Sequence, residues 1–179
     1  SIYGMHASGH WSDQREDNVL DGGSYYYGVY ETADDKFISI GSIEGKFHDE
    51  LVELTGLEDA PTTERNDQDD WIDKKARLAD LIRSKTRDEW DEVMLGSDVC
   101  YAPVLDLSEA PQHPHNVARG SFVEIDGVIQ PGPAPRFSRT PGEVQMPPPA
   151  PGQHTEEILT DWGFSSEDVE KLKDVGAIG

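Results

Sequence analysis

The order of hydrophobic and polar residues indicates a β-hairpin near the start of the patterned part of the chain. Tyr25–Thr32 is rich in aromatic side chains, and Phe37–Ile43 alternates between apolar and small or polar positions. Residues 33–36 between them, Ala-Asp-Asp-Lys, favour a turn. Alternation on both sides of a turn is typical of two antiparallel strands that each bury one face. This hairpin is the strongest β signal in the sequence.

Helical periodicity follows the hairpin. An apolar face begins after Glu44 and ends near Gly56, a second helix is expected from about 68 to 84, and Thr86 begins a capping-box pattern for a third. Two further capped helices are expected at 155–162 and 165–175. The residues predicted to face inward are Phe47, Leu51, Val52 and Leu54, then Trp71, Ile72, Leu78, Ala79, Leu81 and Ile82, then Trp90, Val93 and Met94.

Two long segments without helical or strand periodicity enclose this region. Residues 1–24 are rich in Gly and Ser, and residues 131–153 contain eight of the chain's prolines. A short hairpin around Asp126-Gly127 precedes the second segment. We therefore predict an α+β small domain with extended linkers. The expected parts are an incoming linker (1–24), the small domain (25–120), a hairpin with a proline-rich return linker (121–153), and C-terminal helices (154–179).

Composition narrows the possible partners. The 179 residues include 36 acidic and 15 basic side chains, for a formal net charge of -21. This charge argues against a nucleic-acid partner, since phosphate binding needs a basic footprint, and against anionic membrane surfaces. No segment approaches the ~20 apolar residues of a membrane span, and none has signal-peptide character. We expect a cytoplasmic protein.

Few residues are candidates for chemistry. Cys100 lies in the apolar run Val99–Leu105, which predicts an inert thiol in a buried strand. The histidine pairs (His6 with His10, His113 with His115) and the acidic residues of 67–73 lack the spacing of known metal sites, so we expect no metal.

Glu44 stands out because it lies where an apolar strand ends and a helix begins. A carboxylate there is held by rigid elements and can face a cleft, with helix amides nearby. Tyr27, on the opposing strand, is expected to reach toward the same end of the hairpin. The sequence alone leaves open that Glu44 is simply an acidic residue at a helix N-terminus.

Several segments resemble the central region of α-methylacyl-CoA racemases, which belong to the family III CoA-transferase group. The matching stretches are 18–27, 29–34, 40–44, 97–104, 113–116, 119–120, 133–138, 154–159 and 162–163. The resemblance follows the whole chain in order. Glu44 lies in the Gly-x-Ile-Glu-x-x-Phe pattern, although Gly45 and Lys46 stand where the family often has Pro-Gln.

The resemblance implies that the chain is the C-terminal half of a two-domain α/β enzyme. The main His/Asp acid–base pair and most CoA contacts would then come from a large domain encoded upstream, against which the C-terminal helices would dock. Glu44 matches the glutamate that supports the catalytic His, and Tyr27 matches an active-site tyrosine. The implied reaction inverts the 2-methyl centre of an acyl-CoA substrate, without a cofactor because the CoA thioester is itself the substrate, in an interlocked homodimer. The chain alone is expected to be inactive.

Three alternatives remain at this stage. The family also contains CoA-transferases, which move CoA between carboxylic acids and use an aspartate nucleophile from the large domain. This half could act mainly as an assembly module for the dimer. The excess of Asp and Glu also permits a domain adapted to high salt.

Overall fold

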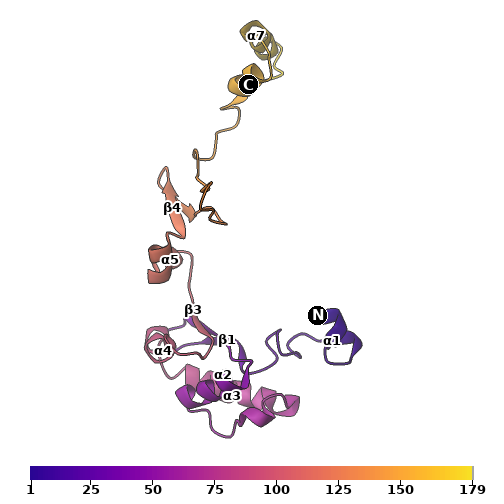
Figure 1. Cartoon of the computed structure of the whole chain (residues 1–179), viewed down its shortest axis with the longest axis vertical. Helices are drawn as coiled ribbons and strands as arrows, with labels where there is room; N and C mark the ends of the chain where they lie inside the picture. The colour runs from indigo at the N-terminus through magenta and orange to yellow at the C-terminus, as the bar shows by residue number, and fades with distance from the viewer. Residues whose placement is uncertain (179) are drawn as a thin grey trace. The chain divides into compact units, whose positions relative to one another are not determined.

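The computed structural model describes residues 1–178 and divides into two compact units, one ending at Asp106 and the other beginning at Leu107. Figure 1 shows the chain coloured from its N-terminus to its C-terminus. The first unit contains α1 (Ile2–Ala7), β1 (Tyr27–Glu31), β2 (Phe37–Gly41), α2 (Gly45–Thr55), η1 (Thr62–Glu64), η2 (Gln68–Asp70), α3 (Trp71–Ile82), α4 (Arg87–Met94) and β3 (Tyr101–Val104). The second contains η3 (Ala110–Gln112), α5 (Pro114–Arg119), β4 (Phe122–Ile125), β5 (Val128–Pro131), α6 (Thr155–Asp161) and α7 (Ser166–Asp174).

A three-stranded antiparallel sheet in the order β1-β2-β3 forms one side of the first unit. The expected hairpin is confirmed, with Tyr30 opposite Ile38. Ile38 and Ile40 are buried whereas Phe37 is exposed, as the alternation predicts. Both strands are shorter than expected: Tyr25 and Tyr26, which are buried in the core, precede β1, and β2 ends at Gly41. Pro103 lies in β3, an edge strand, where its missing amide does not break the ladder.

The helices cover this sheet with their apolar faces, and α2 lies beside α3 (Figure 1). Leu51, Leu78, Ile82, Trp90 and Met94 are all buried, in agreement with the periodicity. Gly56 ends α2 with a φ of 72°, and Thr86 forms the predicted capping box with Glu89. Two inward predictions are wrong, since Ile72 is 81% exposed and Val93 lies at the edge of the helix face with 36% exposed.

One expectation about an irregular segment is also corrected. Ile2–Ala7 forms a short helix within residues 1–24, where no helical period was found, and these residues lie in the first compact unit. Asn18 anchors this segment: it is buried, and its side-chain amide nitrogen lies 2.6 Å from Asp21 Oδ2. This hydrogen-bonded turn has no hydrophobic period, so pattern analysis does not detect it.

The second unit follows the expectations for its short elements. Asp126 and Gly127 both have positive φ, 51° and 77°, and connect β4 to β5 as a two-residue hairpin. Glu109 is the N-cap residue of η3. The unit contains no helix or strand between Pro131 and Thr155. Ser165 caps α7 through a capping box with Asp168.

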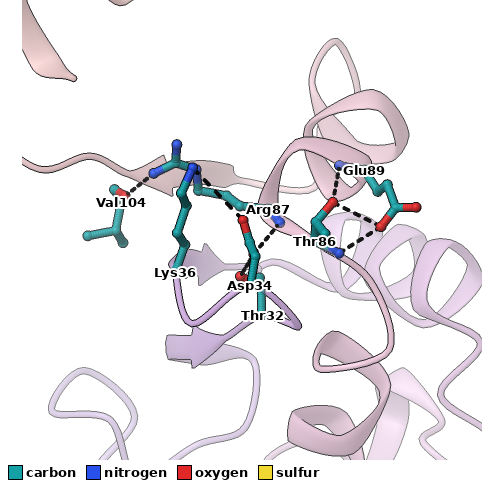
Figure 2. A network of polar contacts seen from close by, with 7 residues as sticks. All are labelled: Thr32, Asp34, Lys36, Thr86, Arg87, Glu89 and Val104. Carbon is teal, nitrogen blue, oxygen red and sulfur yellow. Dashed lines mark hydrogen bonds and ion pairs between the residues drawn. The ribbon is translucent and has the colours of Figure 1, made fainter.

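A polar network joins the hairpin turn of the first unit to α4 and β3 (Figure 2). Asp34 Oδ1 accepts hydrogen bonds from the Thr32 hydroxyl at 2.6 Å and from the Arg87 amide at 3.0 Å. The Arg87 guanidinium in turn donates to the Val104 carbonyl at 2.9 Å. The Thr32 hydroxyl and the Arg87 amide lower the pKa of the Asp34 carboxyl from its ordinary value. Asp34 thus supplies a negative charge to the N-terminus of α4.

We expect Asp34→Asn to lower the free energy of unfolding by about 0.5–1 kcal/mol at pH 7. The folded-state pKa is depressed below the ordinary 3.8, so the stabilisation is complete above about pH 4 and disappears as the pH falls through the folded value. Urea unfolding at several pH values measures this. Asp35→Asn is the control, since it removes the same charge from the adjacent exposed residue. Equal effects of both variants, or a gap from wild type that persists in acid, would contradict the prediction.

Candidate functional site

Glu44 lies at the junction that the sequence indicated, between β2 and α2. It is the N-cap residue of α2 in an extended conformation, with φ of -72° and ψ of 143°. Its carbonyl accepts hydrogen bonds from the Phe47 and His48 amides, both at 3.0 Å. Its side chain is exposed and, in the part of the chain that the structure describes, has no hydrogen bond or ion pair. The carboxylate therefore projects from a rigid backbone and remains available to a group outside this chain.

Tyr27 lies at the same end of the hairpin as Glu44. It is the first residue of β1 and pairs with Gly41, the last residue of β2. A Cβ at Gly41 would lie 3.6 Å from the Tyr27 ring, which therefore covers the glycine. The structure thus brings Tyr27 and Glu44 to the same end of the hairpin, and no hydrogen bond joins their side chains among the described residues.

A cleft of about 970 Å³ is lined by Tyr26 and Ile43, the neighbours of Tyr27 and Glu44 in the sequence, but not by Tyr27 or Glu44 themselves. Its walls come from the N-terminal segment and from the loop before α3, and they include Trp11, Tyr26, Arg65 and Trp71. Ile43, the residue before Glu44, also lines it. The volume is within the range of small-molecule sites, and its lining combines aromatic side chains with many polar and charged ones, including Asp17, Asp67 and Asp69.

A buried histidine beneath the site was not singled out by the sequence analysis. His48 has no exposed surface; its Nε2 lies 2.7 Å from the Tyr25 hydroxyl and its Nδ1 lies 2.7 Å from the Thr62 hydroxyl. The Thr62 hydroxyl also contacts Asp49. His48 precedes Leu51 by one helical turn, so the periodicity that predicted Leu51 inward places His48 on the same face. This helical spacing is the feature of the sequence that could have predicted the burial of His48.

The hydrogen bonds of His48 have one consistent direction. Burial, and then the positive charge of Arg65, lowers the pKa of His48 to about 4, so the ring is neutral at pH 7. The Thr62 hydroxyl donates to the Asp49 carboxylate and must accept from His48 Nδ1–H. His48 Nε2 then accepts from Tyr25, whose pKa is raised by burial. This series of hydrogen bonds connects α2, the Thr62 loop and the hairpin.

Cys100 is exposed, which corrects the expectation of a buried strand residue. It precedes β3 with a φ of 56°, and its carbonyl accepts the Gly41 amide at 2.9 Å, so the backbone turns the side chain outward. Partial desolvation, followed by the charges of Glu44 and Asp98, raises the pKa of the thiol. The thiol is therefore protonated at neutral pH.

The other candidate groups have ordinary local contacts. His6 pairs with Asp13 at 3.5 Å, His10 contacts Ser8 at 3.0 Å, and Asp70 pairs with Lys74 at 3.1 Å. Within residues 1–178, no three His, Cys, Asp or Glu side chains are close enough to hold a metal ion. None of the helices in this described part is long and apolar enough to cross a bilayer.

Comparison with known proteins identifies the family. The sequence profile described as "CoA-transferase family III" matches residues 2–155. The chain belongs to the CoA-transferase family III. Within this family, the chain is 38% identical to human α-methylacyl-CoA racemase over 90% of its own length and 43% of the relative, and 40% identical to the mouse racemase over 92% and 44%. The chain therefore spans less than half the length of these curated relatives.

The fold is that of the same family. The crystal structure of a CAIB/BAIF family protein from Brucella suis matches with a TM-score of 0.63 at 19% identity, over 89% of this chain and 43% of that chain. The expected fold class, an α+β portion of a family III CoA-transferase fold, is confirmed.

Proposed function

We propose that this chain is the C-terminal part of a racemase that inverts the 2-methyl centre of 2-methylacyl-CoA thioesters. The observation that carries the proposal is the similarity to the human and mouse α-methylacyl-CoA racemases over nearly the whole chain. The exposed Glu44 carboxylate, held at the end of β2 without a partner in the described part of the chain, supports it.

The proposed chemistry is removal and return of the proton on the carbon next to the thioester. One group must take the proton and an acid on the opposite face must return it, each positioned close to the carbon with a suitable pKa. We assign these groups to the part of the enzyme outside this chain. Glu44 would orient the histidine among them and favour its charged form, and Tyr27 would line the pocket. The thioester itself activates the proton, so the reaction needs no cofactor.

The proposal also assigns partners to this chain. Its first partner is the N-terminal half of the same enzyme, and the whole would form an interlocked homodimer. Two features support docking of α6 and α7 on another surface. Trp162, which directly follows α6, is 81% exposed, and Val175, which directly follows α7, is 76% exposed.

A CoA-transferase is the second candidate function, and the family's description favours it. Transfer of CoA between two carboxylic acids requires a carboxylate nucleophile but no exchange of the α-proton. Glu44 would then have no role in proton transfer. The two reactions therefore differ in whether solvent hydrogen enters the substrate at C2.

Deuterium incorporation distinguishes these functions. We expect the full-length enzyme to introduce deuterium from D₂O at C2 of a single-enantiomer 2-methylacyl-CoA, and to transfer no CoA to an added carboxylic acid. The isolated 179-residue chain is the control and should show no exchange, because it lacks the proposed acid–base pair.

CoA transfer without deuterium incorporation would replace the racemase proposal by the transferase. Exchange by the isolated chain would overturn the two-part assignment, and a strict monomer without affinity for the N-terminal half would contradict an assembly role.

A further inference from the structure

The backbone around Glu44 is held by a residue distant from it in sequence. Arg65 Nε donates to the carbonyl of Ile43 at 3.1 Å, and this carbonyl belongs to the peptide that enters Glu44. The same guanidinium donates through Nη1 to the Thr62 carbonyl at 2.8 Å. One planar cation thus connects the end of the hairpin to the η1 loop, and the loop lies against the start of α2.

The η1 loop is itself fixed from several sides. The Thr62 hydroxyl contacts His48 Nδ1 at 2.7 Å, and the Arg65 carbonyl accepts from Nε1 of the buried Trp71 at 2.8 Å. A Cβ at Gly45 would lie only 3.0 Å from the Thr62 methyl group, so the loop packs directly on the residue after Glu44. Arg65 is therefore anchored to the core, and it transmits that rigidity to the Ile43–Glu44 peptide.

We propose that Arg65 is a positioning residue for Glu44: its guanidinium fixes the Ile43–Glu44 peptide and thereby the direction in which the carboxylate projects. This inference rests on the role of Glu44 in the proposed function. The Glu44 side chain has no partner in the described residues, so the direction in which it leaves the backbone is set by the backbone alone. The fork of an arginine can hold two carbonyls at once, whereas a lysine ammonium lacks this planar geometry.

The test uses the full-length enzyme and the rate of deuterium exchange at C2. We expect Arg65→Met to lower kcat by about 10-fold with little change in KM, because a misplaced supporting group slows the reaction more than it weakens binding. Arg65→Lys, which keeps the charge, should show a smaller loss. Arg77→Met is the matched control: Arg77 also donates to a loop carbonyl, that of Glu58 at 2.7 Å, and its removal should leave kcat unchanged.

A double variant separates positioning from general stability. If Arg65 acts through Glu44, then Arg65→Met combined with Glu44→Gln should be no slower than Glu44→Gln alone, whereas independent effects would multiply. A folded Arg65→Met enzyme with wild-type kcat, or multiplying effects, would overturn this inference while leaving the role of Glu44 intact. If Arg65→Met does not fold, a wild-type kcat in Arg65→Lys would overturn the positioning role of Arg65 instead. Undiminished exchange in Glu44→Gln would overturn both the positioning role of Arg65 and the role of Glu44 in the proposed function.

Discussion

Glu44→Gln should lower the rate of α-proton exchange by the full-length enzyme by about 100-fold, the lower end of the range for acid–base catalysis. Glutamine has nearly the same shape and can still accept a hydrogen bond, but it has no charge to stabilise a protonated histidine. The loss should appear in kcat rather than KM, because the substitution removes no contact that holds CoA in the proposed arrangement. Deuterium incorporation at C2, measured by mass spectrometry, gives both constants.

Glu53→Gln is the matched control for this prediction. Glu53 is an exposed carboxylate on the same helix, α2, so its replacement makes the same chemical change away from the site. We expect wild-type exchange from Glu53→Gln. Undiminished exchange in Glu44→Gln would remove Glu44 from the mechanism, and an equal loss in both variants would show that the net charge of α2, rather than the position of Glu44, matters.

Trp90→Ala should reduce the free energy of unfolding of the 179-residue chain by about 3–5 kcal/mol. Trp90 has no exposed surface, and its indole Nε1 donates to the Ile82 carbonyl at 2.7 Å. Its removal therefore leaves a large cavity between α3 and α4 and a buried carbonyl without a donor. Urea unfolding followed by circular dichroism measures the change.

Trp162→Ala provides the comparison for the same substitution at a surface position. Trp162 is 81% exposed in this chain, so we expect a change within about 0.5 kcal/mol. Both measurements should be made at one salt concentration, because a net charge of -21 makes the stability of the folded state depend on screening. A loss below about 1 kcal/mol in Trp90→Ala would show that the helix layer does not form one cooperative core with the sheet.

Local patterns predicted the hairpin and the helix ends well, because these depend on neighbouring residues. The alternation around Ile38 and Ile40 selects one face of a strand, and the Thr86–Glu89 capping box begins α4 through bonds within one turn. The position of Glu44 at a strand-to-helix junction was predicted in the same way. Ile72 and Val93 were misplaced because periodicity gives a wide face, and only the packed neighbours decide where its edge lies.

Cys100 and His48 show the limit of local patterns. The apolar neighbours of Cys100 predicted burial, but a positive φ before an edge strand turns its side chain outward. His48 is polar and was overlooked, yet tertiary contacts with Tyr25 and Thr62 satisfy both ring nitrogens in the core. Hydrogen-bond partners distant in sequence leave no periodic signal along the chain.

The sequence by itself therefore determined the hairpin, the capped helices, the acidic charge and the position of Glu44 between strand and helix. Each of these depends on side-chain period, local capping or composition. Only the tertiary structure decided what holds the backbone beside Glu44, because the Arg65 guanidinium bonds the carbonyls of Ile43 and Thr62, and the Thr62 hydroxyl contacts the buried His48. Their partners meet only after the chain folds, when α2, the loop and the sheet edge are packed together.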